Sequence, residues 1–276
     1  MTILDSILLG ALQGATEFLP VSSSGHLLAF ERILGVSGGT LRFNVAVHVG
    51  TLLAVCVALR REIASLLRGL CRRERGSAML LLAIVLGSIP AAVAGIGLSS
   101  PMDRLFRPES SAALALVGCG WLFTALWLSA AEVLRGRSPS GGDSQGMPPG
   151  PVKAILIGLA QAVALLPGVS RSGMTIGAGV MGGMGRVDAA RFSFLLSVPV
   201  IAGAGLLELP SLAGEAGALW PALAGAAVAA VTGFFAIRLF LGLARRHTMF
   251  GYAVYCALAG AAALLWWGFH ACKGGV

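Results

Sequence analysis

Charge is what this sequence has least of. Asp, Glu, Lys and Arg together make up 12% of the 276 residues, about half the share of a typical soluble domain. Hydrophobic residues take 57%, and the mean hydropathy is +0.86. This balance excludes an ordinary soluble globular protein and predicts a chain that lies in a lipid bilayer.

Cysteine is also sparse, and no C-x-x-C pair or metal-ligand spacing occurs. The five cysteines are Cys56, Cys71, Cys119, Cys256 and Cys272. Their scatter argues against a disulfide framework and against a structural zinc site, which leaves packing as their role. The N-terminus lacks the basic region that opens a cleavable signal, so we expect no signal peptide there.

Two passages of the chain are alike. Residues 7–26 read ILLGALQGATEFLPVSSSGH, and residues 155–174 read ILIGLAQAVALLPGVSRSGM, with eight of the twenty aligned positions identical. Each passage is an apolar run broken by Pro, Ser and Gly. Interrupted apolar segments at matching places in two halves are typical of a polar site inside a membrane protein.

Six further apolar runs are long enough to cross a bilayer, which takes about 20 residues. They cover 43–59, 77–98, 112–134, 192–209, 220–243 and 250–268. The segments around the two alike passages, about 3–40 and 153–188, have short apolar arms and a polar break. Such a break survives at membrane depth only where protein or a water-filled cavity covers it. We therefore interpret both as re-entrant helical hairpins.

The expected fold is an all-α integral membrane protein with an inverted repeat, in one membrane domain. Each unit is one re-entrant helical hairpin plus three transmembrane helices. Repeat 1 covers about 1–137, a Pro- and Gly-rich linker about 138–152, and repeat 2 about 153–276. Because three is an odd number, the second unit enters the membrane upside down, and the hairpin tips can meet near the midplane.

Basic side chains are distributed unevenly in this arrangement. Fourteen of the 20 Lys and Arg fall on one side of it, six of them within 60–75, and five fall on the other side. The positive-inside rule assigns the rich side to the cytoplasm and both termini to the outside. The net charge of +8 then reflects topology, and no nucleic-acid partner is expected.

Polar and ionisable side chains gather at the two breaks. The first has Gln13, Glu17, Ser22, Ser23, Ser24 and His26; the second has Ser170, Arg171 and Ser172. An ionised side chain in an apolar segment is costly unless it is paired or hydrated. Arg with hydroxyls and free N–H groups at a helix start is how proteins hold phosphate. A carboxylate beside it would repel phosphate, unless a divalent cation intervenes or the carboxyl group handles a proton.

Structural interpretations of the same residues stay open. Glu17 and Arg171 could form an ion pair that pins the hairpins together. Four of the serines are natural helix caps: Ser22, Ser24, Ser170 and Ser172. Ser23 stands where the second copy has Arg171, and His26 stands where it has Met174, so a special role is favoured for both. For His48, within an apolar span, neither interpretation is preferred.

The motifs resemble those of a known family, the bacterial undecaprenyl-diphosphate phosphatases of the bacitracin-resistance type. The resemblance rests on Gln13-x-x-x-Glu17-Phe-Leu-Pro-Val-Ser-Ser-Ser-Gly-His26, on PGVSRSG at 167–173 and on FSFLLSVP at 192–199. It implies an inner-membrane hydrolase that removes the terminal phosphate of undecaprenyl diphosphate. The carrier lipid then re-enters peptidoglycan synthesis. Because bacitracin sequesters the diphosphate form of the lipid, the resemblance also implies resistance to bacitracin. The family's acidic motif has Glu or Gln, three residues, then Glu; the Gln form here removes a second carboxylate.

The residues and the resemblance together predict metal-assisted hydrolysis of a phosphoanhydride, with the active site facing the periplasm. Arg171 and the tip amides would neutralise charge in the transition state. A divalent cation, Mg²⁺ or Ca²⁺, would bridge Glu17 and the diphosphate. Ser23 is the candidate nucleophile and His26 its proton partner, while attack by water with Ser23 only binding stays open. The predicted substrate-binding residues are Gln13, Ser22, Ser24, Ser170 and Ser172.

A second class of function is a carrier or flippase for the polyprenyl phosphate lipid, because inverted repeats with broken helices are typical of transporters. A carrier needs no nucleophile, so Ser23 and His26 favour the enzyme. The expected partners are the polyprenyl diphosphate lipid and membrane lipids, and a homodimer is left open.

Overall fold

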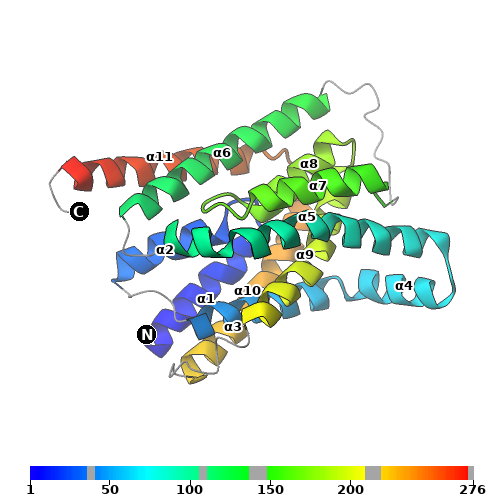
Figure 1. Ribbon diagram of the computed structural model, residues 1–276, viewed down its shortest axis with the longest axis horizontal. Coiled ribbons are helices and arrows are strands. Elements are labelled where there is room, and N and C mark those ends of the chain that lie inside the picture. Colours follow the sequence, from blue (N-terminus) through cyan, green and yellow to red (C-terminus); the bar gives the residue numbers. More distant parts are fainter. Residues whose placement is uncertain (36–40, 106–110, 137–147, 209–218, 273–276) are drawn as a thin grey trace.

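The computed structural model describes residues 1–35, 41–105, 111–136, 148–208 and 219–272, and within these ranges it forms eleven helices and no strand (Figure 1). In chain order the helices are α1 (Ile3–Glu17), α2 (Ser23–Leu34), α3 (Leu41–Ala58), α4 (Arg60–Cys71), α5 (Arg75–Leu105), α6 (Ser111–Gly136), α7 (Pro151–Val163), α8 (Arg171–Met181), α9 (Arg186–Glu208), α10 (Leu219–Ala244) and α11 (Phe250–Cys272). The predicted linker falls largely on residues outside the described ranges.

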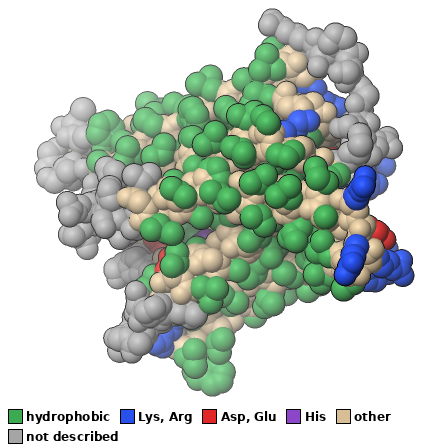
Figure 2. Space-filling view, turned by 45° about the vertical axis from the view of Figure 1, so that its right-hand side comes forward, with side chains coloured by type: hydrophobic (Ala, Val, Ile, Leu, Met, Phe, Trp, Pro, Cys, Tyr) green, Lys and Arg blue, Asp and Glu red, His purple; other side chains and the backbone are tan. Residues whose placement is uncertain are grey.

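Six helices are long and apolar enough to cross a membrane: α3, α5, α6, α9, α10 and α11. They agree with the six predicted runs, although α9 begins at Arg186, six residues earlier than expected. Large apolar side chains such as Trp220 and Leu265 are about three-quarters exposed, at 75% and 76%, as suits contact with lipid tails. Figure 2 shows hydrophobic side chains over the middle of the molecule and most visible Lys and Arg towards one end. The chain is therefore an all-α, multi-pass membrane protein.

One expectation about the connections is wrong. The basic stretch 60–75 lies between the predicted runs 43–59 and 77–98 and was for that reason expected to be a loop, but it contains helix α4, and α5 follows it after a short turn. Ile63 and Leu66 of α4 pack against the core, while Arg60 and Arg61 on the same helix are exposed. Apolar side chains at helical spacing give the stretch a buried face, which the high count of Arg conceals.

The two alike passages each form a helix, a break and a second helix. α1 and α2 flank residues 18–22, and α7 and α8 flank residues 164–170. None of the four helices exceeds 15 residues, which is too short to cross the bilayer alone. In Figure 1, α1 begins at the end of the molecule opposite α4, whereas α7 begins near the α4 end. Both breaks lie between these two ends of the molecule. The inverted relation of the two complete units stays a prediction.

Matched glycines let each hairpin approach the rest of the chain closely. Gly10 of α1 lies against Gly225 of α10, and its counterpart in the repeat, Gly158 of α7, lies against Gly87 of α5. A Cβ atom on Gly10 or Gly158 would collide with the carbonyl oxygen of the facing glycine. Small residues bring membrane helices into backbone contact in this way. Each hairpin thus packs on a span from the other half of the sequence.

Aromatic rings next to the first break pack against one another in the buried core. Phe18 contacts Phe194 of α9 edge-on at 5.4 Å between ring centroids, and Phe194 contacts Phe240 of α10 at 5.9 Å. Phe18, Phe194 and Phe240 are at most 1% exposed. This packing fixes the residue next to Glu17 and so holds the end of α1 in place.

Candidate active site

The two breaks meet through an ion pair and a hydrogen bond. Arg171 Nη2 lies 2.6 Å from Glu17 Oε1, and Ser172 Oγ donates to the Leu19 carbonyl at 2.8 Å. The motif residues come together although about 150 positions separate them in the chain. The structure therefore places the most polar parts of both hairpins at one point.

Glu17 is the centre of this cluster. Its Oε2 accepts hydrogen bonds from Ser23 Oγ at 2.6 Å and from Gln13 Nε2 at 3.0 Å. The Gln13 amide also lies 3.4 Å from Nε2 of His48. A guanidinium, a hydroxyl and an amide thus surround a carboxylate that is only 9% exposed, which explains how an apolar segment tolerates it.

A cavity of about 500 Å³ opens on this cluster. The predicted site residues that line it are Gln13, Glu17, Ser22, Ser23, Ser24, Ser170 and Arg171. Helices α2 and α8 both begin at its wall, at Ser23 and Arg171. Helix N-termini attract anions, because their backbone N–H groups lack partners and their dipoles end in partial positive charge. The cavity thus combines a cation, hydroxyls and two helix starts.

Two of the tip serines cap helices, in agreement with the structural interpretation. Ser22 Oγ accepts from the Gly25 amide at 3.4 Å, and Ser170 Oγ accepts from the Gly173 amide at 3.1 Å. Ser172 does not line the cavity, since its hydroxyl turns to the Leu19 carbonyl. Its part is to join the hairpins, and direct binding of substrate is not the role that this geometry supports.

The predicted pairing of Ser23 with His26 is not present. His26 Nδ1 lies 2.7 Å from the Ser22 carbonyl oxygen, and Nε2 lies 2.6 Å from the Tyr255 hydroxyl. Its ring points away from the cavity towards α6 and α11, whereas Ser23 turns to Glu17. Glu17 therefore takes the place next to the Ser23 hydroxyl that was expected for His26.

Several cavity residues did not belong to the predicted site. Asn44 and His48 of α3, Glu31 of α2 and Glu208 of α9 also line it. For His48 the signal was an ionisable side chain within a membrane span, which marks a functional position by default. Tyr255, which does not line the cavity but contacts His26, gave no signal, because no motif in the sequence around it indicates this contact.

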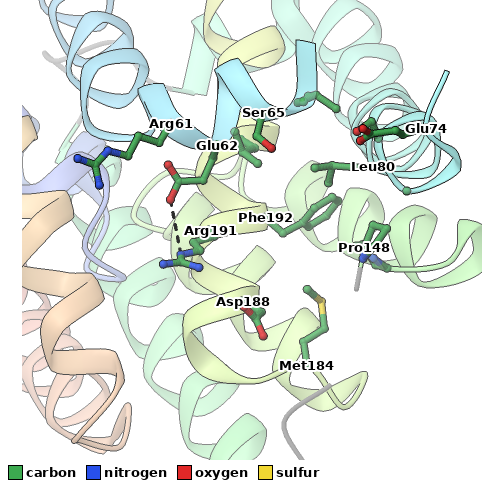
Figure 3. Close-up of a pocket in the computed structure, with 15 residues that line it drawn as sticks. Arg61, Glu62, Ser65, Glu74, Leu80, Pro148, Met184, Asp188, Arg191 and Phe192 are labelled. Carbon is green, nitrogen blue, oxygen red and sulfur yellow. Dashed lines mark ion pairs between the residues drawn. The ribbon is translucent and has the colours of Figure 1, made fainter. Parts of the chain in front are cut away.

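Two other cavities hold none of the predicted site side chains. One of about 510 Å³ lies at the basic end between α4, α5 and α9, where Arg191 Nε is 3.9 Å from Glu62 Oε1 (Figure 3). The other, of about 620 Å³, is a largely apolar groove that runs from His247 to Tyr255. Neither brings a cation, a hydroxyl and a carboxylate of the motifs together.

The described residues contain no group of three His, Cys, Asp or Glu side chains that could hold a metal ion. At the cavity, the available protein ligands are oxygens. Glu17 supplies a carboxylate, and Gln13 supplies an amide Oε1 that is buried and has no hydrogen-bond partner in the described part of the chain. Oxygen ligands suit Mg²⁺ or Ca²⁺, and Mg²⁺ commonly uses one or two carboxylates together with substrate phosphates. The residues present fit such an ion.

Comparison with known proteins identifies the family of the chain. Residues 6–262 match the family model described as bacitracin resistance protein BacA. An undecaprenyl-diphosphatase of Geobacter sulfurreducens is 42% identical over 96% of this chain and 98% of its own length, and one of Geobacter metallireducens is equally similar. One of Korarchaeum cryptofilum is 37% identical over 96% of this chain and 99% of its own. The chain, matched over nearly its whole length, belongs to the BacA family of bacitracin resistance proteins.

Proposed function

We propose that the chain hydrolyses undecaprenyl diphosphate to undecaprenyl phosphate and inorganic phosphate. The observation that carries the proposal is the joined cluster of Glu17, Ser23 and Arg171 at a cavity inside a membrane protein. Similar proteins named undecaprenyl-diphosphatase support the choice of substrate. The lipid tail stays in the bilayer, and the diphosphate reaches the cavity.

Arg171 is suited to hold the terminal phosphate. Its Nη2 is engaged by Glu17, whereas its Nη1 is buried and has no hydrogen-bond partner among the described residues. A phosphate oxygen would satisfy this nitrogen, and the amides at the starts of α2 and α8 would receive the other oxygens. The same groups stabilise the charge that spreads over the phosphoryl oxygens in the transition state.

Ser23 and Glu17 are arranged for nucleophilic attack. The Ser23 hydroxyl attacks the terminal phosphorus and gives its proton to Glu17 Oε2, which lies 2.6 Å away. The bond between that phosphorus and the bridging oxygen breaks, and undecaprenyl phosphate leaves with the electron pair. Water then hydrolyses the phosphoserine and releases phosphate. In the alternative route, Glu17 accepts the proton of an attacking water and Ser23 only binds.

We also propose a divalent cation, Mg²⁺ or Ca²⁺, as a cofactor. Glu17 and Gln13 Oε1 would hold it together with oxygens of the diphosphate. When bound, it would supply positive charge that offsets the negative charge of the diphosphate near Glu17.

We place the protein in the bacterial inner membrane with the cavity open to the periplasm. The concentration of Arg in α4, opposite the start of α1 (Figure 1), supports this orientation under the positive-inside rule. Hydrolysis on that face would return the lipid carrier to cell-wall synthesis and would confer bacitracin resistance.

Phosphate release by the purified protein in detergent tests the proposal. Undecaprenyl diphosphate should yield phosphate in the presence of Mg²⁺ or Ca²⁺, and the Ser23→Ala and Arg171→Ala variants should be strongly impaired. Detergent removes the two compartments that a carrier needs, so turnover there identifies an enzyme. A folded protein that releases no phosphate with either ion, but moves the lipid across vesicle membranes, would instead be a carrier.

A further inference from the structure

Ser22 has an unusual backbone conformation. Its φ is +68° and its ψ is 97°, and only one other non-glycine residue among those described, Arg73, has a positive φ. Such conformations are strained and persist only where the surroundings hold them. The counterpart in the second hairpin, Ser170, has an ordinary extended conformation with φ −77°. The strain therefore belongs to the hairpin that carries Glu17 and Ser23, and the repeat does not account for it.

Two buried rings hold the carbonyl groups on either side of this strain. Trp121 Nε1 donates to the Val21 carbonyl at 2.7 Å, and His26 Nδ1 lies 2.7 Å from the Ser22 carbonyl. Trp121 is 4% exposed and His26 is 6% exposed. A carbonyl oxygen only accepts, so Nδ1 of His26 carries the hydrogen and donates it.

Tyr255 completes the arrangement. In the neutral ring, a hydrogen on Nδ1 leaves Nε2 of His26 as an acceptor, so the Tyr255 hydroxyl, 2.6 Å away, donates to it. The Tyr255 ring stacks on His26 with 7° between the planes, and the Trp121 ring meets His26 edge-on at 5.1 Å. Rings from α2, α6 and α11 thus form one unit around the first tip.

Among the described residues, the second hairpin shares only part of this unit: Trp127 Nε1 donates to the Met174 carbonyl at 3.2 Å, but no ring stands in place of His26. Met174 occupies the position of His26, and the Ser170 amide donates instead to the Thr124 hydroxyl at 3.0 Å. The aromatic unit is therefore matched to the tip that carries the proposed nucleophile, where the strained residue directly precedes Ser23.

We propose that Trp121, His26 and Tyr255 are positioning residues, here named the aromatic clamp, that hold Ser22 so that the Ser23 hydroxyl meets Glu17. In this role His26 acts through its Nδ1–H on the Ser22 carbonyl and transfers no proton during the reaction. The inference rests on the proposed function and adds residues to it that touch no substrate.

Two amide substitutions distinguish positioning by His26 from proton transfer. His26→Asn places an N–H donor close to the former Nδ1 but has no acid–base chemistry in the relevant range, whereas His26→Gln carries the same amide one methylene further out. We expect His26→Asn to stay within about tenfold of the unmodified kcat, the worth of one weakened hydrogen bond. His26→Gln and His26→Ala should each fall at least about tenfold further, because neither restores the donor. If His26→Asn is folded and as inactive as His26→Ala, the clamp proposal is overturned.

Substitutions of the other rings remove one hydrogen bond each and keep the aromatic contact. Tyr255→Phe and Trp121→Phe should lower kcat about 3- to 10-fold, with KM unchanged because the clamp does not contact the substrate. In the double variant, the loss of kcat should be smaller than the product of the two single losses, because both substitutions act on the same peptide segment. The matched control is Tyr252→Phe. Tyr252 is the only other tyrosine in the chain and lines the same groove as Tyr255, and the kcat of this variant should be unaltered.

Hydrogen–deuterium exchange tests the clamp without reference to turnover. Peptides covering 19–26 should exchange faster in Tyr255→Phe and Trp121→Phe than in the unmodified protein, while peptides covering 164–174 should not change. Unchanged exchange at 19–26 in both variants would refute the proposal. If the unmodified protein released no phosphate, the proposed function would fail, and the exchange result would still decide whether the clamp exists.

Discussion

Arg186 grips the carboxylate of Glu132 with two nitrogens. Arg186 Nε lies 2.7 Å from Oε1, and Nη2 lies 2.5 Å from Oε2. The backbone amide of Met249 donates to the same Oε1 at 2.9 Å. One side chain of α6 thus ties down the start of α9 and the residue before α11, all within a site where the Glu132 side chain is 3% exposed. This contact joins both halves of the sequence away from the cavity between the two breaks.

Loss of Glu132 should destabilise the protein strongly. Glu132→Ala removes the carboxylate that pairs with Arg186 and accepts from the Met249 amide, and breaking a buried pair costs about 3–5 kcal/mol. The control is Glu62→Ala, which removes a pair that is 3.9 Å apart and more exposed, and such a pair is worth about 0–1 kcal/mol. Thermal unfolding in detergent should show a large drop in Tm for the first variant and almost none for the second. Equal drops would show that the Glu132 pair is no more important than a surface contact.

Glu17 should be required for chemistry and not only for holding the hairpins. Glu17→Gln keeps the shape of the side chain but neither accepts the Ser23 proton nor offers a carboxylate to a cation. We expect turnover to be lost while the protein remains folded and monodisperse by size-exclusion chromatography. A purely structural pair predicts the opposite pattern: Glu17→Gln would lower Tm, and adding Arg171→Met would restore both Tm and activity.

Arg171 should not be replaceable by Lys. Lysine keeps the positive charge but lacks the planar fork that could hold the Glu17 carboxylate and a phosphate oxygen at once. Arg171→Lys should therefore lower kcat about 10²–10³-fold, as loss of a transition-state donor does, and Arg171→Ala should be at least as poor. Phosphate release from well-folded Arg171→Ala at the unmodified rate would remove Arg171 from the mechanism.

Cys71 reports the orientation of the protein. It is exposed at the end of α4, on the side that the Arg distribution assigns to the cytoplasm. In a background where Cys71 is the only cysteine, a membrane-impermeant thiol reagent should label inside-out vesicles and not intact cells. A single cysteine placed at Thr2, at the opposite end of the molecule, should show the reverse. Labelling of Cys71 from outside would invert the proposed topology.

Most of the fold could be predicted from the sequence, because each membrane span requires a continuous apolar run of about 20 residues. α4 was missed because its Arg content resembles a connection, although Ile63 and Leu66 recur at helical spacing. The meeting of Glu17 with Arg171 followed from the repeat, since both stand in matched breaks. The partner of His26 could not be predicted, because spacing along α2 does not give the direction of a ring and Tyr255 lies 229 residues away. His48 was left undecided for a similar reason: the apolar run does not show which face of α3 meets the first hairpin.

The glycine contacts between the two halves also set an order of events during biosynthesis. Gly10 meets its neighbour Gly225 only after more than two hundred further residues have been made, which at ribosomal rates takes roughly 10 s or more. During that time α1 has no α10 to pack against, and the polar break behind it must wait for Arg171 as well. A chain that stops after α6 would leave the glycine face of α1 against lipid. It would also leave the Glu17 carboxylate without the guanidinium of Arg171. Quality-control proteases of the membrane should therefore recognise truncated chains through this hairpin.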